Sequence, residues 1–87
     1  MKTFRLQPID GRKSLNNHHV NQYETDGETW SDLISYTTRV AAYNHTENYI
    51  SIYNCESVTT RRHINAFLDF YGFNTMTKRE MIASCKK

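Results

Sequence analysis

Long hydrophobic runs are missing from this sequence. No segment reaches the roughly 18 to 20 consecutive apolar residues that a membrane-spanning helix needs. The start of the chain, from Met1 to Pro8, also lacks the apolar segment of a signal peptide. We therefore expect a cytoplasmic protein without membrane contact. With 3 glycines and 1 proline the chain is not of low complexity, so residues 1–87 are predicted to form a single domain, with polar residues 10–19 as a loop.

Cysteine is scarce, which excludes the usual metal frameworks. Cys55 and Cys85 are the only two cysteines, and neither has a second cysteine or a histidine at zinc-site spacing. His18 and His19 are adjacent, so on a strand they would point to opposite faces. We therefore expect no metal, no cofactor and two reduced thiols.

Catalytic motifs are absent as well. The sequence contains no glycine-rich phosphate loop, no His-Glu-x-x-His motif and no paired-acid motif. His63 with Ser57 or Cys55 is the only combination that suggests a base and a nucleophile, and nothing in the sequence orients it. We therefore expect a protein that is not an enzyme.

Strand patterns occupy the first part of the chain. Residues 3–7 alternate between apolar and polar side chains and predict a short edge strand. Residues 20–24 and 28–36 flank Asp26-Gly27, a sequence typical of tight hairpin turns. The uneven spacing of apolar residues in the second of these strands predicts that the strand either contains a bulge or starts late.

A second hairpin is predicted from residues 39–44 and 49–54, joined by a polar turn at residues 45–48. Strand alternation places aliphatic side chains on one face, namely Val40, Ala42, Ile50 and Ile52. It places three tyrosines on the other face, namely Tyr43, Tyr49 and Tyr53. These rings either form cross-strand pairs that stabilise the sheet or make a contact surface for another protein.

The periodicity then changes to that of a helix. Apolar residues recur at helical spacing as far as Gly72, a typical residue after a helix end: Ile64, Phe67, Leu68 and Tyr71. Ser57, Thr59 and Thr60 are candidate N-caps, and Thr77 with Glu80 predicts a second helix that begins with a capping box. Strands followed by helices predict an α+β fold, in which a small antiparallel sheet of three to five strands carries one main helix and a short C-terminal helix on one face.

Charge is distributed unevenly along the chain. Residues 24–56 carry six acidic residues against Arg39, a net charge of −5, whereas residues 57–87 carry a net +4. This asymmetry predicts an acidic surface and a basic surface that bind partners. The alternative is that the charged side chains only keep the domain soluble. The acidic hairpin and its tyrosines form the candidate protein-binding site, which comprises Tyr43, Glu47, Tyr49, Tyr53 and Glu56.

The basic candidate site lies where the main helix is predicted to start. Arg61, Arg62 and His63 are unfavourable beside the positive end of a helix dipole, but they accompany free backbone N–H groups that favour an anion. Together with Asn65 they form the candidate contact for a nucleic-acid backbone or an acidic protein groove. The alternative is that they pair internally with acidic residues such as Glu47 and Glu56.

Two motifs carry a resemblance to known proteins. They are Ser35-Tyr36-x-Thr38-x-Val40-Ala41 and Ser57-x-Thr59-Thr60-x-Arg62-His63-Ile64-Asn65-x-Phe67-Leu68, the latter followed by Gly72-Phe73. Over about residues 33–73 the chain resembles small proteins carried by phages, plasmids and conjugative elements of Gram-positive bacteria. These proteins have no agreed activity, so the resemblance implies only an accessory protein of a mobile element.

Small phage proteins without a catalytic motif commonly act by binding. The resemblance therefore implies an inhibitor of a host defence protein, in particular a CRISPR-Cas nuclease, whose phosphate-contacting sites acidic side chains would occupy. The alternative is a small nucleic-acid-binding protein or regulator that uses Arg61, Arg62 and His63. A third alternative is a homodimer formed through the strand edge at residues 3–7.

Overall fold

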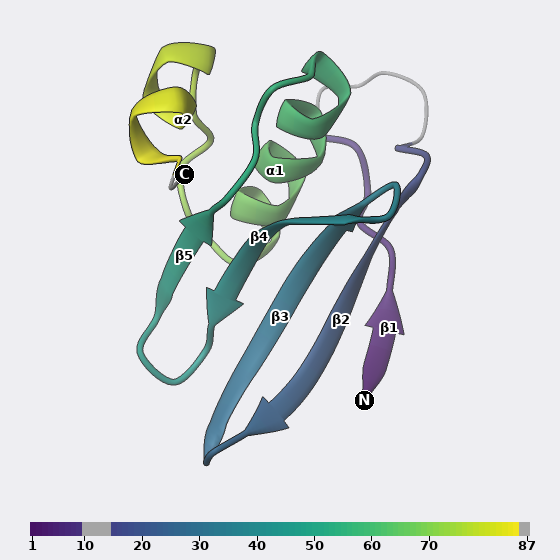
Figure 1. Cartoon of the computed structure of the whole chain (residues 1–87), viewed down its shortest axis with the longest axis vertical. Helices are drawn as coiled ribbons and strands as arrows, with labels where there is room; N and C mark the ends of the chain where they lie inside the picture. Colours follow the sequence, from purple (N-terminus) through teal and green to yellow (C-terminus); the bar gives the residue numbers. More distant parts are fainter. Residues whose placement is uncertain (10–14, 86–87) are drawn as a thin grey trace.

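The computed structural model describes residues 1–9 and 15–85, which form a five-stranded antiparallel sheet and two helices (Figure 1). In chain order the strands are β1 (Lys2–Phe4), β2 (His18–Thr25), β3 (Glu28–Ser35), β4 (Thr38–Asn44) and β5 (Tyr49–Ile52). The helices are α1 (Val58–Phe70) and α2 (Lys78–Ser84). The predicted α+β class is thus confirmed. Among the described residues, neither helix is long and apolar enough to cross a bilayer.

The sheet is a meander, because each strand pairs with its neighbours in sequence and β1 and β5 form the two edges. The predicted edge strand is confirmed, but it lies at Lys2–Phe4 and not at residues 3–7. Beyond Phe4 the backbone N–H of Leu6 donates to the ring of His18, over 2.9 Å, and not to a backbone carbonyl of β2. The predicted loop at residues 10–19 is wrong at its end, where β2 begins at His18; residues 10–14 lie outside the described residues.

The first hairpin closes with the turn that its sequence predicts. Asp26 and Gly27 both have positive φ angles, 51° and 78°, which match the twist of the two flanking strands. A bulge does interrupt the pairing of β3 with β4, but it lies on β4 and not, as predicted, on the strand at residues 28–36. Leu33 pairs with Ala41 but Ile34 pairs with Arg39, so one residue of β4 has no partner on β3.

The predicted faces of the second hairpin are wrong for Tyr43 and for Ala42, which lie on the faces opposite to those predicted. A four-residue turn makes Asn44 and Tyr49 cross-strand partners, and this register pairs Tyr43 with Ile50 and Ala41 with Ile52. Because directly paired residues share a face of the sheet, Tyr43 lies on the aliphatic side. A shift of one residue in the register exchanges all inward and outward side chains, and the alternation of each strand alone does not fix that register.

The hydrophobic core lies between one face of the sheet and α1. A row of paired residues crosses the inner face, formed by Phe4, Val20, Leu33, Ala41 and Ile52. Ile64, Phe67 and Leu68 of α1 pack into this core and are almost fully buried, as the helical spacing predicts. Truncation of a ring as deeply buried as Phe67 typically costs about 3 to 5 kcal/mol. α2 lies beside α1 near β5 and contributes the buried Met81 (Figure 1).

Both helices begin at predicted caps. Ser57 is the N-cap of α1, and its hydroxyl accepts the backbone N–H of Thr60 over 3.0 Å. Thr77 and Glu80 form the predicted capping box at the start of α2. Gly72 follows the end of α1 with a φ of 82°, a conformation that glycine adopts without strain.

Candidate functional site

The two central candidate tyrosines differ in where they lie. Tyr43 is buried beneath the sheet, its ring 4.4 Å from that of Tyr71 between centroids, and its hydroxyl donates to the side chain of Asn48. We therefore assign Tyr43 to the core and the second turn, and leave it out of any contact surface. Tyr49 is 42% exposed and lies on the opposite face of the sheet.

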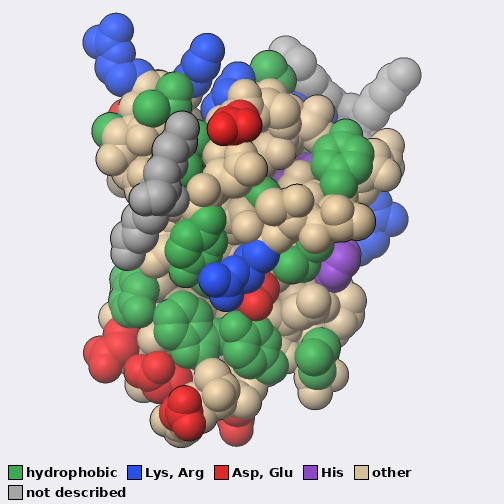
Figure 2. All heavy atoms as spheres, viewed as in Figure 1, with side chains coloured by type: hydrophobic (Ala, Val, Ile, Leu, Met, Phe, Trp, Pro, Cys, Tyr) green, Lys and Arg blue, Asp and Glu red, His purple; other side chains and the backbone are tan. Residues whose placement is uncertain are grey.

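That opposite face, which we call the open face, carries aromatic and charged side chains and is not covered by either described helix. Its members come from β2 to β5 and the residue that follows β5: Tyr23, Trp30, Asp32, Ile34, Arg39, Tyr49 and Tyr53. In Figure 2 hydrophobic side chains gather over the strands around a Lys or Arg side chain and an acidic one. All these members are at least partly exposed.

Ring contacts and a shared carboxylate organise the open face. The ring of Trp30 meets that of Tyr49 edge to face at 6.0 Å, and the guanidinium of Arg39 lies 4.7 Å from the ring centroid of Tyr53. Arg39 also approaches the carboxylate of Asp32 to 3.7 Å. That carboxylate accepts the hydroxyl of Tyr23 over 3.1 Å. Partial burial, and then the negative charge of Asp32, raises the pKa of Tyr23 above its usual value of 10.0.

Charged residues are separated along the sheet. The turns after β2 and β4 lie at the same end of the molecule (Figure 1), and we call the group there the acidic end: Glu24, Asp26, Glu28 and Glu47. Glu56 lies just before α1, at the other end, so the acidic residues proposed with the tyrosines do not form one surface.

The opposite end, where both helices begin, is basic, and Lys and Arg side chains gather at the top of Figure 2. We call this group the basic end: Arg61, Arg62, Lys78 and Arg79. The guanidinium of Arg61 already donates to the backbone carbonyls of Cys55 and Glu56, over 2.9 and 3.0 Å. Arg61 therefore helps to hold the segment that precedes α1.

His63 and Asn65 are structural residues in this fold. His63 is fully buried, and its ring bonds to the hydroxyl of Ser35 over 2.9 Å and to the carbonyl of Asn16 over 2.8 Å. The side chain of Asn65 bonds to both backbone polar groups of Met76. The expected contact of His63 and Asn65 with an anion therefore does not fit the structure, and we leave both residues out of the basic site.

Two serine–histidine pairs were not found by sequence reasoning. Ser35 binds His63, and Ser31 lies 2.7 Å from His45 and 2.8 Å from the hydroxyl of Tyr71. Such distances suit a nucleophile and its base. Both serines are buried, however, with 0% of Ser31 and 3% of Ser35 exposed. The pairs are therefore structural hydrogen bonds between β3 and the segments packed against it.

The buried histidines are held in the neutral form. Burial lowers the pKa of His18 from 6.5 to about 4, and nearby His63 adds to this effect. Burial also lowers the pKa of His63 and of His45. Because Leu6 donates to one nitrogen of His18, the ring proton belongs on the other nitrogen, which has no hydrogen-bond partner among the described residues.

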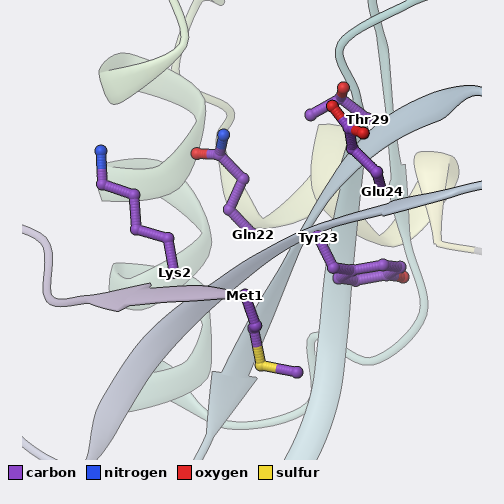
Figure 3. A pocket seen from close by; sticks show the side chains of 6 residues that line it. All are labelled: Met1, Lys2, Gln22, Tyr23, Glu24 and Thr29. Atoms are coloured by element: carbon purple, nitrogen blue, oxygen red, sulfur yellow. The ribbon is translucent and has the colours of Figure 1, made fainter.

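A shallow hollow lies at the acidic end, where β1 meets β2 (Figure 3). Lys2, Gln22 and Glu24 project to one side of the sheet there, and Tyr23 projects to the other. Within the described residues, no three histidine, cysteine or acidic side chains lie close enough to hold a metal ion. The open face carries more partly exposed aromatic side chains than this hollow does, so we take the open face as the candidate contact surface.

The fold and this surface define a small α+β domain whose five-stranded meander leaves one face open to contact. Residues 4–83 match the family described as a family of unknown function, DUF8033, and the chain belongs to that family. No curated protein and no solved structure matches the chain significantly.

Proposed function

We propose that this domain acts by binding a larger protein and blocking it. In its specific form, the proposal is that a phage or other mobile element carries the domain against a host defence protein, and that the target is a CRISPR-Cas nuclease. The acidic end is the observation that supports this most directly. It presents carboxylates from two neighbouring turns at one end of the sheet.

Competition with a nucleic acid is the mechanism that these carboxylates suggest. An RNA-guided nuclease holds its nucleic acids in a positively charged channel, which contacts mainly the phosphate backbone. Asp26 and Glu47 are exposed at the tips of the turns and would occupy arginine or lysine sites in such a channel. Complementary charge speeds the encounter of two proteins and suppresses wrong partners.

The test uses purified proteins. The domain is mixed with a purified RNA-guided nuclease from a Gram-positive host, and co-elution and cleavage of target DNA are measured. We expect a stable complex and slower cleavage, and we expect Asp26→Asn with Glu47→Gln to weaken both. The matched control is Thr25→Ala, which alters an exposed uncharged residue beside Asp26. If the domain neither co-elutes with any such nuclease nor slows its cleavage of DNA, the proposal is contradicted.

The second candidate function is nucleic-acid binding by the basic end. It is supported by the clustering of four cationic residues where the two helices begin. Since Arg61 supports the fold, the informative variants are Lys78→Ala and Arg79→Ala, both at exposed positions. Binding of duplex DNA or RNA that weakens steeply with salt, with a smaller slope in these variants, would favour this candidate. Size-exclusion chromatography separately tests a homodimer through β1.

A further inference from the structure

The open face has the composition of a protein contact surface. Tryptophan, tyrosine and arginine are the residues most enriched at positions that dominate binding energy, and all three are present. Trp30 lies on β3, Tyr49 on β5 and Tyr53 directly after β5, and the small residues Ala42 and Ser51 are buried on the same face. Because Trp30 already contacts Tyr49, and Arg39 already contacts Tyr53, these side chains lose less conformational freedom when a partner covers them.

A guanidinium group already occupies this face. Arg39 lies 4.7 Å from the ring centroid of Tyr53 and 3.7 Å from Asp32, while 49% of its side chain remains exposed. An aromatic ring and a carboxylate together are the surroundings that a planar guanidinium favours. The contact of Arg39 with Tyr53 and Asp32 therefore shows that this face can hold a guanidinium group.

The charge around the open face excludes a polyanion as its preferred ligand. Asp32 balances the charge of Arg39, so the remaining charges beside the rings belong to Glu28 on β3 and to Asp26 and Glu47 in the adjoining turns. Glu28 is on the same face as Trp30, two positions earlier on the strand. A phosphate backbone would be repelled there, whereas a cationic polypeptide would be attracted.

We propose that the open face binds an arginine-rich segment of a protein partner. Guanidinium groups of that segment stack on Trp30, Tyr49 and Tyr53, and the acidic end meets its remaining positive charge. Arginine is favoured over lysine because its planar group both stacks on rings and bonds to carboxylates. This inference rests on the proposed function, because it names the surface and the partner chemistry for the same binding activity.

The test is a titration of the whole chain, followed by NMR, with a synthetic peptide of alternating arginine and glycine. A lysine–glycine peptide and an oligothymidylate of equal length are the comparison ligands. We expect the arginine peptide to bind most tightly, to shift amide signals of β3, β4 and β5, and to weaken as salt increases. Preferential binding of the oligothymidylate, or no binding of the arginine peptide, would overturn the inference.

Three variants locate the site. Tyr49→Ala removes an exposed ring and should weaken the arginine peptide roughly tenfold. Arg39→Ala vacates the contact with Tyr53 and Asp32, so the peptide should bind at least as tightly as before; weaker binding would contradict the inference. Val58→Ala is the control, because its exposed apolar side chain belongs to α1, and affinity should not change. Thermal melting of each variant verifies that it is folded.

The nuclease assay separates this inference from the proposed function. If the wild-type chain and Tyr49→Ala inhibit the nuclease equally, the proposed function stands and the open face is not its contact surface. If the arginine peptide binds the open face but no nuclease is inhibited, the assignment of the surface stands and the proposed function fails.

Discussion

The ring of His63 lies 4.9 Å from the ring of His18, between centroids, and this pair connects α1 to the start of β2. Removal of the His63 ring leaves a cavity and deprives Ser35 and Asn16 of a hydrogen-bond partner. We expect His63→Ala to lower the free energy of unfolding by about 3 kcal/mol, measured by urea denaturation. His19→Ala is the matched control on the other face, and an equal loss there would contradict the prediction.

Acid should destabilise the domain through the same pair. The unfolded chain takes up protons below about pH 6.5, whereas burial keeps the folded pKa of His18 near 4 and lowers that of His63. Since the unfolded state then binds more protons, the contribution of His18 to stability falls as the pH decreases from about 6.5 to 4, by up to about 1.4 kcal/mol per pH unit, and His63 adds a loss of the same sign.

Denaturation curves at several pH values measure this loss. His18→Gln keeps an acceptor for the N–H of Leu6 but cannot be protonated, so its stability should depend less steeply on pH. A wild-type stability that is the same at pH 7 and pH 4.5 would show that these histidines are not held neutral.

Gly72 should resist substitution because of its backbone conformation alone. Its φ is 82°, and a Cβ added there would meet nothing within 4 Å. Its N–H and that of Phe73 close the end of α1 on the carbonyls of Asp69 and Leu68, over 3.1 and 2.8 Å. We expect Gly72→Ala to cost about 1 kcal/mol in thermal melting, and Gly72→Asn to cost less, because asparagine tolerates positive φ. The reverse order would indicate a steric cause.

The two thiols should differ in reactivity. Cys55 is buried with 4% of its surface exposed, whereas Cys85 is partly exposed after α2. We expect a maleimide reagent to modify Cys85 at least about ten times faster, because Cys55 becomes accessible only when the structure opens. Mass spectrometry of Cys55→Ser and Cys85→Ser follows each thiol separately. Denaturant should abolish the difference, and equal rates without it would contradict the buried position of Cys55.

Local signals were sufficient to predict most of the fold. Asp26-Gly27, Gly72 and the capping box at Thr77 each act through the backbone of a few neighbouring residues, so the sequence reports them directly. To predict the faces of the second hairpin, the register of its two strands must also be derived from the length of the turn. The turn at residues 45–48 implies that Tyr43 pairs with Ile50, and strand alternation without that register assigned Tyr43 to the wrong side.

The buried hydrogen bonds of Ser31 and Ser35 could not be predicted from such local signals. β3 turns Ser31 and Ser35 inward and Trp30 and Ile34 outward, which is the reverse of the usual apolar-in pattern. The serines are tolerated inside because partners from distant parts of the chain, such as His63, satisfy their hydroxyls. Alternating serines on one face of a strand are the sequence signal, but only the tertiary structure supplies their partners.

The meander also bears on how the chain reaches its native state. Every strand pairs with a strand adjacent in sequence, so no pairing requires the closure of a loop across the whole chain. Pairing of strands that are adjacent in sequence is associated with faster folding than pairing of distant strands. We expect the hairpins to form one after another, and the docking of α1 over Leu33 to complete the cooperative transition.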